Sequence, residues 1–251
     1  MKISIITITF NSEKTVEDTI KSVVSQDFPN VEYLIIDGLS KDKTLQVVNK
    51  YSAYIDKVVS EKDKGLYDAL NKGIKHATGE VIGMLHSDDV YANNQVLSKV
   101  AQQFAIDPTL EAVYADLVFV DRENTDKVLR TWKSGAYKED AFKQGWMPPH
   151  PTFFVKKSVY DRLGGFNLDL KLSADYELML RFIHKEKIKI AYLPEIIVKM
   201  RMGGISNTSF FVKLKANMED KLAWKLNGVK PGWFTTIRKP LKKLSQYFVK
   251  S

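Results

Sequence analysis

The segment from Gly83 to Tyr91 carries two consecutive carboxylates, Asp88 and Asp89, directly after an apolar run. Like charges side by side at the end of a buried strand repel each other and raise each other's pKa. A bound divalent metal ion or the hydroxyls of a ribose would relieve this repulsion. The alternative is a turn in which one carboxylate caps a helix that begins near Asn93 and Asn94.

The elements that must position these carboxylates follow an alternating strand and helix pattern. The pattern predicts strands at 3–10, 33–36, 57–60 and 80–85, and helices at 15–25, 44–51 and 67–76. Such alternation is typical of a parallel sheet with helices on both faces. Ligands of these sheets bind beyond the carboxyl ends of the strands, where Asn11, Asp37, Asp88 and Asp89 fall. The second half is expected to hold strands at 113–116 and 119–121 and a helix at 175–184.

Composition narrows the class of protein. The chain has 251 residues, 44% of them hydrophobic, which suits one large α/β domain. It has no cysteine, which excludes disulfides, thiolate zinc sites and a cysteine nucleophile. The run from Ile3 to Phe10 lacks a cleavage site and predicts a buried strand, and no run reaches the roughly 18 apolar residues of a spanning helix. We therefore expect a cytoplasmic protein that does not cross a membrane.

The end of the chain is a separate electrostatic unit. The net charge is +8, and from Val229 onward there are six basic residues and no acid: Lys230, Arg238, Lys239, Lys242, Lys243 and Lys250. Apolar residues recur there at spacings of three and four, which predicts an amphipathic helix. This helix either docks on the body or attaches to an anionic membrane surface, where each basic residue contributes about 1 kcal/mol. No nucleic-acid-binding motif accompanies the charge, so nucleic acid is not an expected partner.

Two other nucleotide-binding classes lack their signatures here. The turn from Thr9 to Glu13 has no glycine, so it does not match a dinucleotide-binding turn. A phosphate-cradling Gly-x-x-x-x-Gly-Lys run is also absent. We therefore expect a metal ion, and not a nest of backbone N–H groups, to neutralise phosphate charge.

Five motifs, in matching order and spacing over residues 1–210, resemble inverting family-2 glycosyltransferases of the GT-A fold. They are "ISIITITFNSEKTVEDTIKSVVSQ", "YLIIDGLSKDKT", "SEKDKGLYDALNKGIKHATGEVIGMLHSDDVY", "HPTFFVKKSVYDRLGGFNLDLKLSADYELMLRF" and "RMGGISN". The third is similar to members that build bacterial surface polysaccharides of the colanic-acid type. The resemblance implies a mostly parallel central sheet flanked by helices. It implies a nucleotide-sugar-binding half (1–112), an acceptor and catalytic half (113–210), and a helical basic extension (211–251).

The resemblance assigns the donor site, which would take a UDP-, GDP- or dTDP-sugar. It implies that Thr9 and Phe10 line the base, that Asp37 binds the base, that Asp88 contacts the ribose, and that Asp89 ligates Mn²⁺ or Mg²⁺. A hard cation that bridges diphosphate oxygens needs only one or two protein carboxylates. Further candidates for the donor pocket are Asn11, Asp63, Asp68 and Asn71. Asp68 is alternatively an ordinary acid in the first turn of a helix.

The same resemblance implies that Asp175, in "SADYEL", is the catalytic base that takes the proton of the acceptor hydroxyl. An inverting transfer needs one such base opposite the leaving nucleoside diphosphate. The alternative is that Asp175 caps the following helix, with Ser173 as its rival. Glu177 is a candidate for an assisting acid.

Four more residues have two open interpretations. His150, in "PPHPTFF", is an acceptor contact and a possible metal ligand, or a structural histidine. Arg201 closes over the diphosphate or forms a surface ion pair. Trp146, and with it Tyr114, stacks on a sugar of the acceptor or belongs to the core.

The chain lacks the Gln-x-x-Arg-Trp motif of processive members and their spanning helices. The sequence therefore predicts a metal-dependent enzyme that adds one sugar to a saccharide or lipid-linked acceptor, peripheral at the inner face of a membrane. Two alternatives stay open: a non-catalytic sugar-nucleotide or membrane-binding module on the same fold, and a nucleotidyltransferase.

Overall fold

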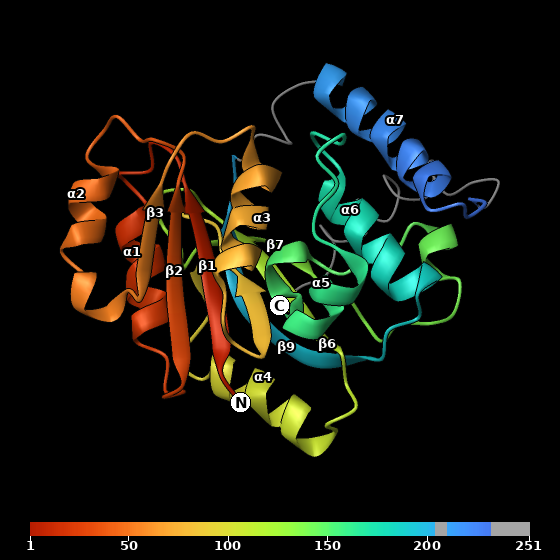
Figure 1. Cartoon of the computed structure of the whole chain (residues 1–251), viewed down its shortest axis with the longest axis horizontal. Helices are drawn as coiled ribbons and strands as arrows, with labels where there is room; N and C mark the ends of the chain where they lie inside the picture. The colour runs from red at the N-terminus through yellow and green to blue at the C-terminus, as the bar shows by residue number, and fades with distance from the viewer. Residues whose placement is uncertain (204–209, 232–251) are drawn as a thin grey trace.

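The computed structural model describes residues 1–203 and 210–231 of the chain (Figure 1). Its sheet contains β1 (Ile3–Thr9), β2 (Val31–Asp37), β3 (Lys57–Ser60), β4 (Val81–Met84), β5 (Val90–Tyr91), β6 (Ala112–Val120), β7 (Val128–Trp132), β8 (Phe154–Lys156) and β9 (Ile190–Arg201). The helices are α1 (Val16–Val24), α2 (Thr44–Asn49), α3 (Leu66–His76), α4 (Val96–Ile106), α5 (Lys157–Leu163), α6 (Ala174–Met179) and α7 (Phe210–Leu226). Short 3₁₀ turns lie at Ser52–Tyr54, Ala141–Gln144 and His150–Thr152.

The strands lie in the order β3-β2-β1-β4-β8-β6-β9-β5, with β7 paired to β6. The first four strands are parallel, as predicted, because helices carry the chain back between them. The parallel order ends at β8, which runs antiparallel to both β4 and β6. The sheet as a whole is therefore mixed, with its parallel half at the amino-terminal side.

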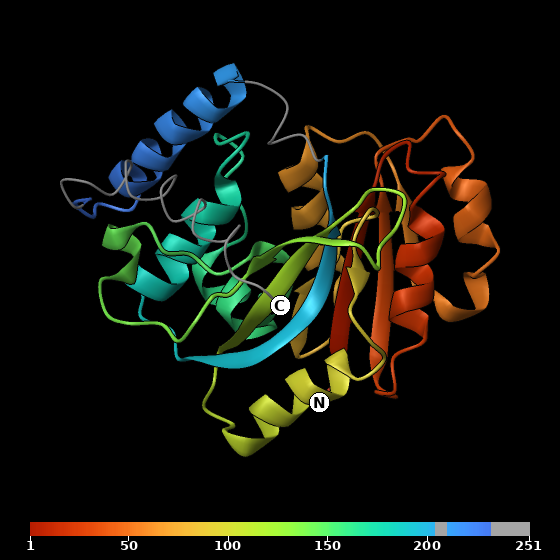
Figure 2. The same ribbon diagram turned by 180° about the vertical axis from the view of Figure 1, so that it is seen from behind.

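Helices cover both faces of this sheet and create two cores (Figures 1 and 2). Alternate side chains of β1 enter opposite cores: Ile6 packs with residues of α3, α5 and α6, and Ile5 packs with residues of α1, α2 and α4. This alternation follows from the two-residue repeat of a strand. A strand that is buried on both faces has a largely continuous run of apolar residues in its sequence. This is why β1 and β2 could be predicted from the sequence.

Two predicted elements differ from the structure. The strands expected at 113–116 and 119–121 are one continuous strand, β6, buried along its whole length. The charged residue Asp116 is the reason that the sequence predicts two strands here. Its carboxylate is satisfied inside the protein by the N–H of Ser134 and the hydroxyl of Tyr192. The helix expected at 175–184 is present as α6 followed by one π-helical turn, Leu180–Lys185.

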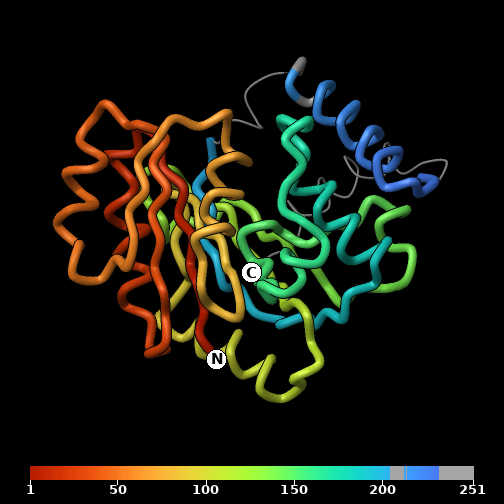
Figure 3. The backbone as a smooth tube through the Cα atoms, in the orientation of Figure 1, coloured from red at the N-terminus to blue at the C-terminus, as the bar shows by residue number. Residues whose placement is uncertain are grey.

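Helix α7 lies at the outer edge of the molecule beside α6 (Figure 3). Ala223 and Trp224 of α7 belong to the same core as α3 and α6, and the indole N–H of Trp224 donates to the hydroxyl of Tyr176. The predicted boundary between residues 210 and 211 therefore does not separate α7 from the core. The predicted basic amphipathic helix falls on residues 232–251, which lie outside the described residues. Within 1–203 and 210–231, no helix has the length and apolar content to span a bilayer.

Candidate functional site

Three parallel strands end side by side at one edge of the sheet. Thr9, Asp37 and Ser60 are in register as the last residues of β1, β2 and β3. The buried carboxylate of Asp37 accepts hydrogen bonds from the N–H and hydroxyl of Ser40 and from the hydroxyl of Ser60. Asp37 therefore shapes the loop after β2. Its expected direct contact with a base is not supported, because the side chain has no exposed surface.

The loop after β1 completes this edge. Asn11 adopts φ 51°, donates its N–H to the hydroxyl of Ser40, and accepts the N–H of Lys41 through its side-chain oxygen. Asparagine tolerates this left-handed conformation better than most residues. Asn11 thus ties the end of β1 to the loop after β2, and its expected ligand contact is replaced by this structural role.

A surface that can hold a flat ring lies between these loops. Phe10 is 63% exposed, which is unusual for an aromatic side chain at a strand end. A Cβ on Gly38 would lie 2.7 Å from Oδ2 of Asp63 and 3.4 Å from the Phe10 ring, so both side chains lie directly beside this glycine. Phe10, Gly38 and Asp63 therefore line one surface, and the expected contact of Phe10 and Asp63 with the donor stays a prediction. Thr9 is buried beneath it and does not reach the surface.

Lys72 of α3 forms ion pairs with the acids on the other side of this surface. Its ammonium lies 2.8 Å from Asp63 and 3.5 Å from Asp68. Burial acts to lower the pKa of Lys72, but its hydrogen bonds with Asp63 and Glu61 outweigh burial and raise it. Asp68 also accepts the N–H of Lys64, as an acid in the first turn of a helix does. The alternative interpretation of Asp68 is therefore the one that its contacts support.

Asn71 does not face a donor pocket. Its side-chain amide donates to the carbonyl of Phe166 at 2.9 Å and accepts the N–H of Phe166 at 2.8 Å. A Cβ on Gly165 would lie 2.3 Å from the Asn71 oxygen, so glycine is needed for this approach. Asn71 pins the loop before α6 to α3, which corrects the expected donor contact.

The two adjacent carboxylates after β4 have different surroundings. Asp89 is 1% exposed: Oδ1 accepts the N–H of Arg201, the Asp89 carbonyl accepts the hydroxyl of Thr19, and buried Oδ2 has no partner in the described residues. Burial and the charge of Asp88 raise the pKa of Asp89 well above its usual range. Asp88 is only half-buried, and its carboxylate accepts no hydrogen bond from any residue that the structure describes.

This contrast bears on the expected division of roles. A ligand reaches the accessible carboxylate of Asp88 more readily than the enclosed one of Asp89, and the expected metal role of Asp89 stays a prediction. Helix capping is excluded, because the side chain of Asn93 accepts the N–H of Gln95 at the start of α4. No cluster of three or more His, Asp, Glu or Cys side chains suited to a metal ion occurs in residues 1–203 and 210–231. An accessible, unpaired carboxylate nevertheless fits Mn²⁺ or Mg²⁺, which take most of their other ligands from phosphate and water.

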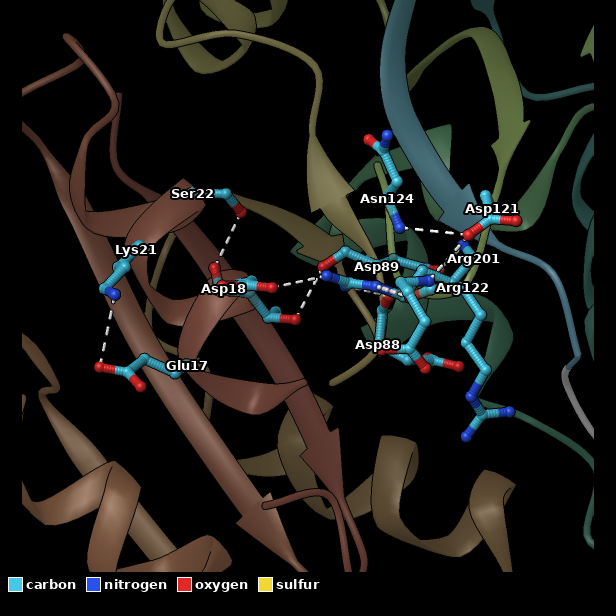
Figure 4. A network of polar contacts seen from close by, with 12 residues as sticks. Glu17, Asp18, Lys21, Ser22, Asp88, Asp89, Asp121, Arg122, Asn124 and Arg201 are labelled. Atoms are coloured by element: carbon cyan, nitrogen blue, oxygen red, sulfur yellow. Dashed lines mark hydrogen bonds and ion pairs between the residues drawn. The ribbon is translucent and has the colours of Figure 1, made fainter. Parts of the chain in front are cut away.

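Arg201 is the hub of the network drawn in Figure 4. Its three guanidinium nitrogens donate to the carbonyl of Arg122 at 3.1 Å, the carbonyl of Asp88 at 2.8 Å and the carboxylate of Asp18 at 2.6 Å. The side chain is 5% exposed. The expected contact of Arg201 with a diphosphate is not supported, because each nitrogen is already bound to a protein oxygen. Arg201 instead holds the turn that presents Asp88.

Asp175 lies in the first turn of α6 and is half-buried. Its Oδ1 accepts the hydroxyl of Tyr67, from α3, at 3.1 Å. Burial and the charge of Asp175 raise the pKa of Tyr67, so this hydroxyl stays a donor. The Ser173 hydroxyl does not cap α6 and donates to the carbonyl of Ala216. Asp175 accepts Tyr67 instead of capping the helix, so a carboxylate oxygen remains available.

Two histidines pack against each other beside the turn that carries Asp88. The rings of His86 and His150 are 5.7 Å apart, and His150 packs edge-on against Phe166 at 5.6 Å. Burial lowers the pKa of His86, while the charges of Asp88 and Asp175 act to raise it. Burial lowers the pKa of His150 to about 3, with a smaller effect of His86. His150 is therefore neutral, and its expected role as an acceptor contact or metal ligand stays a prediction.

His86 and Tyr67 are site residues that the sequence interpretation missed. His86 follows β4 at the carboxyl edge of the sheet, and the rule that selected Asp88 selects it too. Tyr67 has no comparable signal, because it meets Asp175 across 108 positions of sequence.

Two other candidates are structural. The indole N–H of Trp146 donates to the carbonyl of Ser134 at 2.7 Å, and its ring packs against Tyr114 and Phe142. The expected sugar contacts of Trp146 and of the buried Tyr114 are therefore not supported. Glu177 is buried and pairs with Arg181, whose guanidinium binds the carbonyls of the loop before α6, so it is not an assisting acid.

Comparison with solved structures confirms the predicted GT-A fold. TarS of S. aureus, solved in complex with UDP, superimposes with a TM-score of 0.64 at 20% identity, over 90% of this chain and 70% of that chain. A mannosyltransferase of Pyrobaculum calidifontis, solved with GDP-Man and Mn²⁺, gives a TM-score of 0.67 at 20% identity, over 98% of this chain and 69% of that chain. At 20% sequence identity, this structural similarity supports the fold and nothing beyond it.

Sequence comparison identifies the family. The family model described as glycosyl transferase family 2 matches residues 4–164. An uncharacterised glycosyltransferase of Mycobacterium tuberculosis is 31% identical over 181 residues, which cover 71% of this chain and 68% of the relative. A PGL/p-HBAD biosynthesis glycosyltransferase of Mycobacterium bovis is 26% identical over 211 residues, 82% of this chain and 79% of the relative. The chain is a glycosyltransferase and belongs to glycosyl transferase family 2.

Proposed function

We propose that this glycosyltransferase transfers one sugar, with inversion, from a nucleoside-diphosphate sugar to an acceptor hydroxyl, and that it depends on Mn²⁺ or Mg²⁺. The observation that carries the proposal is a chain of contacts from the segment of Asp88 to Asp175. The ring of His86, two residues before Asp88, lies 5.7 Å from that of His150, which lies 5.6 Å from Phe166. Phe166 stacks on Tyr67 at 5.5 Å, and Tyr67 donates to Asp175. An inverting transfer needs one carboxylate near the diphosphate of the donor and one near the acceptor hydroxyl.

In this reaction Asp175 accepts the proton of the acceptor hydroxyl. The acceptor oxygen forms a bond to the anomeric carbon, and the bond from that carbon to the diphosphate oxygen breaks, with its electron pair leaving on the nucleoside diphosphate. The hydrogen bond from Tyr67 holds the Asp175 carboxylate in place. A metal ion held by Asp88 would stabilise negative charge on the leaving diphosphate.

The base of the donor has a matching surface at the other end of the site. The exposed ring of Phe10 can stack on a base, and the Asp63 carboxylate beside Gly38 can accept its N–H groups. Of the two solved structures compared above, one was solved with UDP and the other with GDP-Man and Mn²⁺, which supports a nucleotide sugar as donor. For the acceptor we propose a saccharide carried on a lipid, as in the synthesis of bacterial surface polysaccharides.

The first test is a thermal-shift panel of UDP, GDP and dTDP, each with and without Mn²⁺, on the purified full chain. Metal-dependent stabilisation by one base identifies the donor nucleotide. Asp88→Asn should abolish the metal-dependent part of the shift. The matched variant Asp89→Asn should retain most of it, because its side-chain oxygen can still accept the N–H of Arg201. The reverse pattern would return the metal role to Asp89.

The second test separates binding from turnover. Asp175→Asn should keep donor binding and lower turnover by about a hundredfold to ten-thousandfold, the usual contribution of a general base. Equal loss of donor binding and turnover would contradict the role of Asp175. Product analysis decides between classes: a nucleoside diphosphate supports the transferase, and pyrophosphate a nucleotidyltransferase. No shift and no product with any sugar nucleotide would favour a non-catalytic module.

A further inference from the structure

Helix α7 buries its two acids and exposes four of its apolar residues, although acids face water and apolar residues face the core in an ordinary surface helix. Glu219 and Asp220 are buried against the body, together with Ala223 and Trp224. On the outer face, Leu214, Met218, Leu222 and Leu226 are each between 39% and 65% exposed. These four side chains follow one another at intervals of four residues, so they form one continuous stripe. We call these four residues the α7 stripe.

Basic residues border the α7 stripe. Lys215, Lys221 and Lys225 are exposed on the same outer face, and none forms an ion pair with a residue in the described part of the chain. The acids of α7 do not balance them on this face, because both point inward. The outer face of α7 therefore combines an apolar stripe with positive charge.

The buried acids join this helix firmly to the part of the protein that carries Asp175. The carboxylate of Glu219 accepts the N–H groups of Leu172 at 2.7 Å and Ser173 at 3.0 Å, directly before α6. Directly after the end of α7, the side-chain amide of Asn227 donates to Glu177 of α6 at 3.0 Å. The α7 stripe and the proposed catalytic base are thus held by one rigid set of contacts.

We propose that the α7 stripe is a docking face for an anionic membrane surface. Charge complementarity selects this occupant: apolar side chains enter the boundary between headgroups and acyl chains while lysines pair with anionic headgroups. The segment 232–251 is a poor occupant, because it adds five basic residues and no acid to an already basic face. A second copy packed stripe to stripe would set lysines against lysines. The inference deepens the proposed function, since it names the surface at which a lipid-carried acceptor is met.

The test measures co-sedimentation of the full chain with vesicles, in the absence of donor and acceptor. This readout does not use turnover, so its failure is distinct from failure of the proposed transferase activity. The wild-type chain should bind vesicles that contain phosphatidylglycerol, and should bind pure phosphatidylcholine vesicles more weakly. The double variant Met218→Gln with Leu222→Gln should bind the anionic vesicles at least about tenfold more weakly, because two inserted side chains are lost.

Two variants make the result specific. Ile106→Gln replaces an exposed apolar residue of α4 (71% exposed) at the opposite end of the molecule (Figure 1) and should bind as the wild type does. Lys221→Glu with Lys225→Glu leaves the α7 stripe intact and should weaken only the part of binding that salt suppresses. Circular dichroism confirms that each variant is folded.

Three results would overturn the proposal. The first is no binding of the wild-type chain to anionic vesicles. The second is wild-type binding by the Met218→Gln, Leu222→Gln variant, which would assign vesicle binding to another basic segment. The third is a wild-type dimer in solution that the same double variant converts to a monomer, which would identify the α7 stripe as a contact between copies.

Discussion

Three aspartates at the carboxyl edge of the sheet carry the same chemical group in three different surroundings. Asp89 is enclosed and hydrogen-bonded to the backbone, Asp88 is accessible and unpaired in the described residues, and Asp175 is held by a tyrosine hydroxyl. A carboxylate that binds a cation must keep free oxygens within reach of the ligand. Surroundings therefore decide which of the three can bind a cation and which can take a proton.

A fourth carboxylate, Glu32 of β2, has a structural role that pH can test. Burial acts to raise the pKa of Glu32, but hydrogen bonds from Ser4, Thr78 and Lys2 outweigh burial and lower it from 4.5 to about 2. Since the folded pKa is the lower one, the stabilisation is full above pH 4.5 and is lost as the pH falls towards 2. Glu32→Gln should lower the free energy of unfolding at pH 7 by about 2 kcal/mol.

Urea unfolding at pH 7, 4.5 and 3 checks this prediction. The difference between wild type and Glu32→Gln should be largest at pH 7 and should shrink at pH 3. A constant difference across the three pH values would mean that the ionised form of Glu32 is not what stabilises the fold.

At the scale of elements, the end of β9 organises the turn after β4. Arg201 connects three parts of the chain through its side chain and backbone: α1, the loop after β6, and the turn that carries Asp88 and Asp89. The segment after β4 contributes only the two residues of β5 to the sheet, so it depends on such contacts for its position. The site carboxylate is thereby positioned by a strand more than a hundred residues later in the sequence.

Replacement of Arg201 should make the turn that carries Asp88 less rigid. Arg201→Met is expected to weaken metal-dependent binding of the nucleoside diphosphate by about tenfold and to lower the free energy of unfolding by about 1–3 kcal/mol. The neighbouring variant Arg122→Met removes an exposed guanidinium but keeps the carbonyl that Arg201 binds, so it should change neither quantity appreciably. Titration calorimetry and urea unfolding measure the two quantities. Equal effects of the two variants would show that Arg201 has no special role in positioning Asp88.

At the scale of the whole molecule, α7 completes the core on the α6 face of the sheet. Trp224 is among the largest fully buried side chains, and its indole N–H reaches Tyr176 in the helix that carries Asp175. The same helix presents the α7 stripe outward. One helix therefore belongs to the core and to the proposed membrane-facing surface.

If α7 is part of the core, Trp224→Ala should lower the free energy of unfolding by about 3–5 kcal/mol, the usual cost of a large cavity. Leu222→Ala, on the outer face of the same helix, should change it by less than about 0.5 kcal/mol in vesicle-free buffer. Urea unfolding, followed by fluorescence and by circular dichroism, should give one coincident transition for wild type. A separate early transition, or a cost below about 1 kcal/mol for Trp224→Ala, would place α7 outside the cooperative core.

The sequence by itself determined the amino-terminal half of the fold and the edge at which the site lies. Strands buried on both faces are continuous apolar runs, and alternating helices force them to be parallel, so residues at their carboxyl ends had to share one edge. This reasoning selected Asn11, Asp37, Asp88 and Asp89, whereas Phe10, Asp63 and Asp175 were selected with the family resemblance. It divided β6 in two at Asp116, because a sequence does not show the distant partners that satisfy a buried carboxylate.

Only the tertiary structure decided what each of these side chains can do. Asp88 and Asp89 are neighbours of the same type, and their difference comes from Arg201 and Thr19, which lie 112 and 70 positions away. Asn71, Arg201 and Trp146 have suitable chemistry for ligands, but their polar groups are bonded to distant backbone atoms. Burial and pairing depend on the whole packing of the chain, so local sequence names the candidates and the fold selects among them.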